Sequence, residues 1–207
     1  MNFNNIIVYD FETSSAVPET TQILQIAALA LDGRTLEPIE GGEFQSYCKP
    51  TRIEEVQQGA LDVNKLTLEF LADKPSERDV WDAFIKFCEK YSKGKGIWNK
   101  PVSAGYNHLG FDNIITKRAC KDYNTTYPFH PRDSFDVMHL LFFWHENNPK
   151  YIKGSLDYAR GYYGMSSDGA HDAIVDVKQT ADMLVRKIKW MRKIAAKTKF
   201  QGAFANV

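Results

Sequence analysis

Residues 6–13, Ile6-Ile7-Val8-Tyr9-Asp10-Phe11-Glu12-Thr13, predict the central strand of a sheet, because an apolar, β-branched run leads directly into carboxylates. The two-residue period of a strand places Asp10 and Glu12 on one side and Phe11 on the other. Adjacent carboxylates repel each other unless a cation lies between them, and hard cations such as Mg²⁺ and Mn²⁺ prefer oxygen ligands. A strand end with solvated or salt-bridged acids is the alternative interpretation.

Outward from this strand, the pattern predicts a mixed α/β sheet covered by helices, with three strands followed by alternating helices and strands. The turn between the second and third strands is marked by Asp32-Gly33 and Gly41-Gly42. The fifth predicted strand, 134–138, is expected to run into the aromatic stretch 140–144. The further predicted strands are 23–31, 43–49, 101–106 and 134–138, and the predicted helices are 76–90, 112–121, 154–163 and 172–197.

The composition is that of a globular chain that forms one domain, because 207 residues with 43% hydrophobic and 25% charged residues can bury a sizeable core. The longest apolar run, Ile26 to Leu31, is far shorter than the roughly 20 residues that span a membrane. No basic residue precedes Arg34, so we expect no secretory signal, a cytoplasmic protein and no membrane partner. Three cysteines without a C-x-x-C pair predict buried thiols rather than disulfides or a zinc site: Cys48, Cys88 and Cys120.

Charge is divided unevenly along the chain, although 26 basic residues balance 26 acidic ones overall. Residues 186–207 carry basic side chains from Arg186 to Lys199 and no acid, so the preceding body is acidic. This division is compatible with a carboxylate-rich metal site combined with a phosphate-facing patch. A solvated helix face is the alternative interpretation.

Two further segments carry acids where an α/β sheet places functional groups. Asp112 ends the stretch 105–112 (GYNHLGFD), where a strand gives way to a helix, and could instead be an ordinary helix N-cap. His171 and Asp176 are five residues apart, so in one regular helix they would not share a face. Both reach one site if His171 lies in the loop before the helix and Asp176 on its first turns. The alternative is a surface histidine beside an ordinary helix acid.

Taken together, the motifs Y-D-F-E-T, G-Y-N-x-x-x-F-D and A-H-D-A-x-x-D resemble the DEDD exonuclease superfamily in its histidine-bearing branch. The tyrosine-bearing branch requires Tyr at position 172, which is Asp here. Together with these motifs, the segments 25–28 (QIAA) and 47–50 (YCKP) bias the choice of subfamily, and residues 6–186 resemble the nuclease domain of the bacterial exonuclease I family. Members of that family carry further domains, whereas a basic helix extension, 187–207, follows the matched region here, so the resemblance does not imply high processivity.

The resemblance implies a ribonuclease H-like, mixed five-stranded sheet flanked by helices, in a single exonuclease domain over residues 1–207. It implies a metal-dependent 3′-5′ exonuclease that releases nucleoside 5′-monophosphates from single-stranded nucleic acid, DNA being favoured over RNA. The alternatives are trimming of short RNA or tRNA ends, a polymerase-associated proofreading subunit, and a non-catalytic nucleic-acid-binding module. No protein partner is specified.

The resemblance also implies roles for individual residues. Two Mg²⁺ or Mn²⁺ ions would be held by Asp10, Glu12, Asp112 and Asp176, and His171 would be the general base. Tyr106 and Phe111 have the alternative of being core residues. The residues expected to contact the terminal nucleotide are Phe11, Thr13, Leu66, Tyr106, Asn107 and Phe111.

Overall fold

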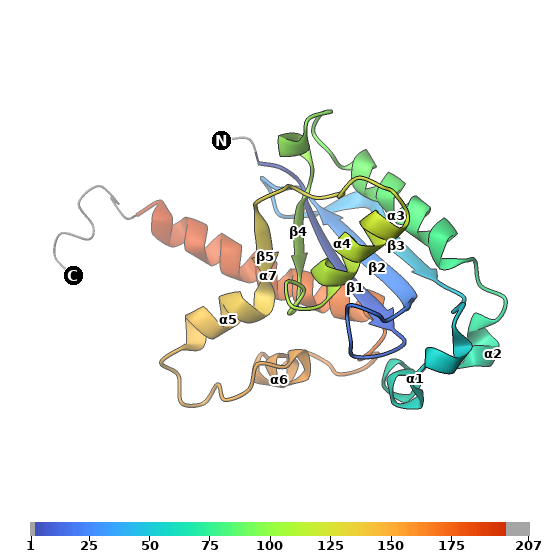
Figure 1. Ribbon diagram of the computed structural model, residues 1–207. Helices are drawn as coiled ribbons and strands as arrows, with labels where there is room; N and C mark the ends of the chain where they lie inside the picture. The colour runs from blue at the N-terminus through green and yellow to red at the C-terminus, as the bar shows by residue number, and fades with distance from the viewer. Residues whose placement is uncertain (1–2, 198–207) are drawn as a thin grey trace.

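One five-stranded mixed sheet forms the centre of the computed structural model, which describes residues 3–197 (Figure 1). The strand order is β3-β2-β1-β4-β5, with β1 antiparallel to β2 and parallel to β4. The predicted mixed five-stranded sheet is thus confirmed. The strands are β1 (Ile6–Thr13), β2 (Ile23–Leu31), β3 (Pro38–Tyr47), β4 (Val102–Gly105) and β5 (Ser134–Asp136).

Helices cover both faces of this sheet (Figure 1). Residues of α3 and α4 pack on one face, and residues of α5, α6 and α7 pack on the other. Two short helices, α1 and α2, lie beyond one end of β1 and β2. The helices are α1 (Gln58–Asn64), α2 (Leu68–Leu71), α3 (Glu77–Lys90), α4 (Asp112–Asp122), α5 (Val137–His145), α6 (Leu156–Tyr162) and α7 (Ala173–Ala195), with 3₁₀ turns at Ile53–Glu55 and Ile97–Asn99.

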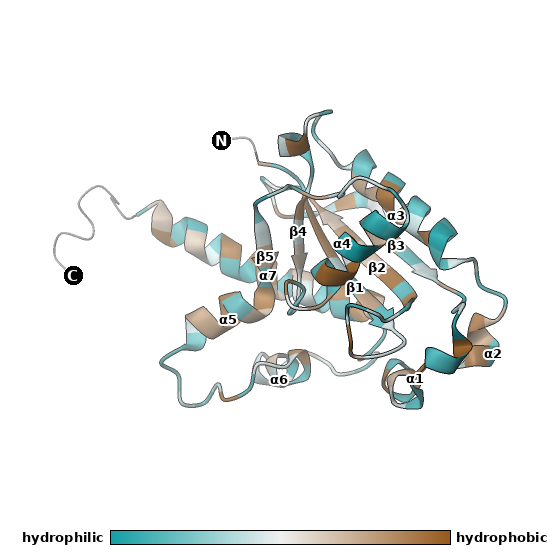
Figure 2. Cartoon of the chain, viewed as in Figure 1, coloured by the Kyte–Doolittle hydropathy of each residue, from teal (hydrophilic) through white to brown (hydrophobic). Residues whose placement is uncertain are grey.

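Alternate residues of β1 enter two separate cores. Tyr9 and Phe11 pack with α3 and α4, whereas Val8 packs with α7. Figure 2 shows the corresponding hydropathy, with largely brown central strands and helices that alternate between brown and teal. Asp10 and Glu12 continue the side of Val8, so their carboxylates are directed toward α7, as the two-residue period predicted.

Two local predictions were wrong. The fifth strand does not continue into the aromatic stretch 140–144, because Asp136 caps a helix there by accepting a hydrogen bond from the Met138 amide at 3.1 Å. Gly41-Gly42 lies within β3 rather than in the turn before it. That turn contains Asp32-Gly33, and Oδ1 of Asp32 accepts the backbone N–H groups of Arg34 and Thr35 at 2.8 Å.

Other features agree with the sequence. Ser76 caps α3 by accepting the Asp79 amide, and the three cysteines are free and buried. Among the helices described between residues 3 and 197, none is long and apolar enough to cross a membrane. Lys199, which belongs to the predicted basic segment, lies outside the described residues.

Candidate active site

Three acids from two distant segments form one cluster. A carboxylate oxygen from each of Asp10, Glu12 and Asp176 lies within 4.8 Å of the others. Asp176 is in the first turn of α7, which packs against β1 and β2 through small residues such as Ala173 and Ala27. Small side chains allow the helix to approach the sheet closely, and this approach brings Asp176 to the acids of β1.

Asp112, the fourth predicted acid, lies beside this cluster at the start of α4. Its Oδ1 accepts the backbone N–H of Phe11 at 3.0 Å, directly between Asp10 and Glu12 in the chain. The alternative that Asp112 is the N-cap does not hold, because Phe111 occupies that position and α4 has no side-chain cap. The Asp112 carboxylate instead attaches the start of α4 to the edge of β1.

Burial and mutual repulsion raise the pKa values of the clustered carboxylates. Burial, with repulsion from Asp10, Asp176 and Asp112, raises the pKa of Glu12 to about 9. Burial and the charge of Asp176 raise the pKa of Asp10 to about 7, and burial raises the pKa values of Asp112 and Asp176. Such a group of oxygens fits a hard divalent cation, which would neutralise the charge that otherwise favours protonation.

A buried arginine supplies positive charge at one side of the cluster. Arg160 of α6 is 2% exposed and donates from Nη2 to Asp176, from Nη1 to Asp157 at 2.5 Å, and from Nε to Gln179. Its charge lowers the pKa of Asp176 and of Asp10, against the larger effect of burial. The sequence analysis missed Arg160. The only signal was Asp157 three residues earlier, which is typical of an exposed helix pair.

His171 lies in the loop immediately before α7, in a left-handed conformation with φ of 65°. Its side chain is 38% exposed, and Nε2 lies 3.7 Å from Oδ2 of Asp157. Lys65 holds the same loop by donating to the Ala170 carbonyl at 2.7 Å. His171 is therefore connected to Asp176 through Asp157 and Arg160.

The predicted nucleotide contacts have different environments. Asn107 has an exposed side chain, while Thr13 is buried and its carbonyl accepts from Asn64 at 3.0 Å. Leu66 packs partly buried on the small cluster around Leu61. Of Thr13, Leu66 and Asn107, only Asn107 has an exposed side chain.

The three aromatic candidates are mainly packing residues. Phe11 is buried in the core with Tyr9, so its side chain does not face the acids, and its contact with the nucleotide stays a prediction. Phe111 packs against the same core. Tyr106 packs against the other core and donates its hydroxyl to the Gly154 carbonyl at 2.8 Å. Tyr106 and Phe111 thus both pack partly buried against a core, as the alternative interpretation expected.

Asp136 fixes the loop that carries Asn107. It accepts the backbone N–H groups of Asn107 and Leu109, both at 3.1 Å, while Asn107 has a left-handed φ of 57°. Gly105 is required just before this loop, since a Cβ there would lie 2.9 Å from the Tyr9 carbonyl oxygen. Sequence reasoning placed Asp136 in a strand and so missed its role as an anchor.

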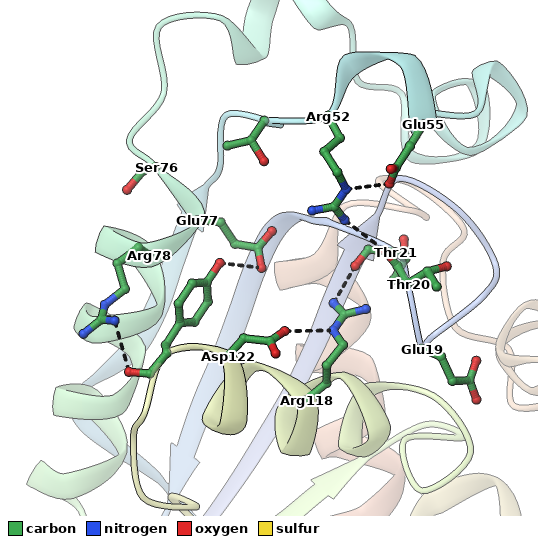
Figure 3. A pocket seen from close by; sticks show the side chains of 12 residues that line it. Glu19, Thr20, Thr21, Arg52, Glu55, Ser76, Glu77, Arg78, Arg118 and Asp122 are labelled. Carbon is green, nitrogen blue, oxygen red and sulfur yellow. Dashed lines mark hydrogen bonds and ion pairs between the residues drawn. The ribbon is translucent and has the colours of Figure 1, made fainter.

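A separate hollow of about 500 Å³ lies away from the acid cluster and contains three arginines (Figure 3). Arg52 pairs with Glu55 at 2.5 Å, and Arg118 lies 3.8 Å from Asp122. Arg78 donates to the Tyr123 carbonyl at 3.0 Å. These contacts link the three guanidinium groups to neighbouring carboxylates and carbonyls, which form a network of polar side chains around the hollow.

The sheet order, the flanking helices and the buried carboxylates define a nuclease-type α/β fold with a site suited to a divalent cation. The family model described as Exonuclease matches residues 7–184, and the chain belongs to this family. Membership of the DEDD superfamily, predicted from the motifs, is thereby confirmed.

Two curated relatives are DNA polymerase proteins. The chain is 24% identical over 192 residues to the PolC-type DNA polymerase III of Thermotoga petrophila, covering 91% of this chain and 12% of that protein. It is 32% identical over 94 residues to the DNA polymerase III subunit epsilon of Buchnera aphidicola (from Acyrthosiphon pisum), covering 43% of this chain and 38% of that protein. The chain thus spans well under half of either relative.

Solved structures of Escherichia coli exonuclease I share the fold. The complex with a dT13 oligonucleotide has a TM-score of 0.73 at 21% identity, covering 88% of this chain and 40% of that one. A zinc-bound complex with single-stranded DNA also has a TM-score of 0.73 at 21% identity, covering 92% of this chain and 43% of that one. These neighbours confirm the ribonuclease H-like sheet and the predicted similarity to exonuclease I.

Proposed function

We propose that the protein is a 3′-5′ exonuclease that hydrolyses single-stranded DNA with two divalent ions, Mg²⁺ or Mn²⁺, and releases nucleoside 5′-monophosphates. The observation that carries this proposal is the convergence of Asp10, Glu12 and Asp176 within 4.8 Å, with Asp112 attached to the same strand. Asp10, Glu12 and Asp176 would hold one ion, and Asp10 with Asp112 the other. Ions bound there would neutralise the phosphodiester and stabilise the leaving 3′ oxygen.

In this proposal the protein's own side chains position the reactants and move the proton. His171 accepts a proton from the attacking water and so acts as the general base. Asp157, 3.7 Å from Nε2, stabilises the imidazolium that results. Asn107, exposed on a loop that Asp136 anchors, hydrogen-bonds to the terminal nucleotide.

Two findings bear on the substrate. The E. coli exonuclease I structures contain single-stranded oligonucleotides, which supports DNA as the substrate class here. The similarity to an epsilon subunit of DNA polymerase III favours one second candidate, proofreading of a polymerase's primer ends. A proofreading enzyme would remove a mismatched 3′ terminus from a duplex many times faster than a paired one when added to its polymerase.

One gel experiment tests the proposed function. DNA and RNA strands labelled at the 5′ end, with free or blocked 3′ ends, are incubated with Mg²⁺, Mn²⁺ or EDTA. We expect shortening of DNA from a free 3′ end in either metal, none in EDTA, and none with the Asp112→Asn variant. Faster shortening of RNA would replace the DNA preference, and internal or metal-independent cleavage would contradict the exonuclease proposal.

A further inference from the structure

A second cavity, of about 560 Å³, lies between the end of α5, the segment after α6, and α7. Both helices belong to the same side of the sheet and pack together (Figure 1). Cavities of this volume are large enough to enclose a drug-sized ligand. The residues that matter for its chemistry are Trp144, Tyr163, Ser166, Gln179, Lys187 and Trp190.

The cavity offers aromatic surface. The rings of Trp144 and Trp190 are in edge-to-face contact, with centroids 4.1 Å apart and an interplanar angle of 89°. Trp144 remains 37% exposed and Trp190 45% exposed, which leaves indole surface toward solvent. Exposed rings held rigidly by a neighbour are suitable platforms for stacking a nucleobase, and such stacking tolerates any base.

Lys187 supplies a cation at the same cavity. Its ammonium lies 4.5 Å from the ring centroid of Trp144 and 5.1 Å from that of Tyr163, and burial lowers its pKa. Within residues 3–197, Lys187 has no carboxylate partner, whereas Arg186 pairs with Asp182 and Lys189 with Glu37. Unlike the arginines of Figure 3, the Lys187 ammonium has only ring contacts in the part of the chain that the structure describes, so an anion can bind to it.

The cavity lies on the stripe of α7 that begins at the acid cluster. Asp176, Gln179, Lys187 and Trp190 are separated by 3, 8 and 3 residues, and at about 100° per residue these spacings place all four on one face of the helix. Gln179 lines the cavity and also accepts from Arg160, which holds Asp176. At 1.5 Å per residue, Lys187 is roughly 16 Å along the helix from Asp176.

We propose that this cavity binds one nucleotide of a single strand, with its base stacked on Trp190 and its phosphate on Lys187. The identity of the strand rests on the proposed function, in which the 3′ end lies at the acid cluster. A stacked strand rises about 3.4 Å per nucleotide, so the bound nucleotide is roughly five positions from the cleaved end. Free nucleoside 5′-monophosphate presents the same chemistry, and the experiment separates the two sources.

The test measures tryptophan fluorescence of the Asp10→Asn variant in EDTA, so that neither hydrolysis nor metal is needed. Oligo-dT strands of two to twelve nucleotides and free 5′-dTMP are the probes. We expect affinity to rise steeply once the strand reaches roughly five nucleotides, and 5′-dTMP to bind much more weakly than the 12-mer. Adding Lys187→Gln should weaken 12-mer binding roughly tenfold and lower the salt slope by about 0.7.

Lys189→Gln is the matched control, because Lys189 pairs with Glu37 outside the cavity, and it should leave 12-mer affinity unchanged. Trp190→Leu tests stacking, and Lys187→Gln keeps the proposal testable if that variant misfolds. Equal 12-mer binding with and without Lys187 overturns the proposal, as does 5′-dTMP binding as tightly as the 12-mer. Binding of an acidic peptide but no oligonucleotide at this cavity also overturns it.

Failure of this proposal is distinguishable from failure of the proposed function. Hydrolysis by the unmodified protein, with Lys187-independent binding, would reject the cavity alone. Binding that depends on length and on Lys187, without hydrolysis by the unmodified protein, would support the cavity and reject the exonuclease.

Discussion

At the scale of single residues, Glu12 is a buried acid whose pKa is raised rather than lowered by its surroundings. Its pKa is about 9 in the folded chain, against an ordinary value of 4.5, because it is buried beside other carboxylates. The pKa of Asp10 is also raised, from 3.8 to about 7. Between the ordinary and the raised values, the folded state holds protons that the unfolded state has released. Without metal, stability must therefore fall as pH rises through this window.

This linkage predicts the pH dependence of the metal-free protein. In EDTA, the melting temperature should decrease from about pH 5 to about pH 9, since deprotonation of Asp10 and Glu12 costs more in the folded state than in the unfolded one. Glu12→Gln should remove most of the decrease, while Glu40→Gln, at an exposed position, should retain it. Circular dichroism melts at each pH provide the measurement, and a flat profile for the unmodified protein would contradict the raised pKa values.

His171 gives a second prediction at this scale. His171→Ala should slow hydrolysis by about 10² to 10⁴, the usual contribution of a positioned base. Its side chain is partly exposed, so folding and metal-induced stabilisation should change little. The exposed His139 provides the matched control, His139→Ala. Single-turnover rates with a labelled strand decide the matter, and equal rates for the two variants would remove His171 from the mechanism.

At the scale of elements, the contact between α6 and α7 depends on Arg160. Removing one partner of a buried ion pair typically costs about 3 to 5 kcal/mol, because the remaining charge is left uncompensated. Arg160→Met should therefore lower the free energy of unfolding by about this amount in EDTA, and divalent metal should restore part of the loss by neutralising Asp176.

Urea denaturation with and without Mg²⁺ measures this effect. Arg186→Met is the control, since Arg186 pairs with Asp182 on the exposed side of the same helix, and it should change stability little. Equal losses for the two arginine variants would show that the buried network does not stabilise the contact between α6 and α7.

The elements also show what a sequence can and cannot predict. The positions of α3 and α7 were predictable to within two residues because they depend on local spacing, as the predicted ranges 76–90 and 172–197 show. The secondary structure of 140–144 was not predictable, because an apolar aromatic run is compatible with both a strand and a helix. The Asp136 cap favours the helix. Arg160 could not be recognised either, since its burial results from packing of α6 against α7.

At the scale of the whole molecule, folding gathers negative charge that the sequence distributes over three segments. Motif spacing predicted which acids would be involved, but the order of the strands makes them neighbours, since β1 lies beside β4, and α4 starts just after β4. Part of the charge is offset within the fold by Arg160. The rest of the charge destabilises the folded state, and a cation bound at the cluster would relieve this repulsion.

The last prediction follows from this imbalance. Mg²⁺ binds only to the folded state, so saturation at 100 times its Kd should stabilise the protein by about 2.7 kcal/mol, a rise in melting temperature of roughly 5 to 10 °C. Asp10→Asn should raise the melting temperature in EDTA, because it removes one of the repelling charges, and should abolish most of the Mg²⁺-dependent rise. Asp168→Asn, at an exposed position, should behave as the unmodified protein does. An equal Mg²⁺-induced rise in both variants would mean that the ion binds elsewhere, and the enzymatic interpretation of the acid cluster would then be wrong.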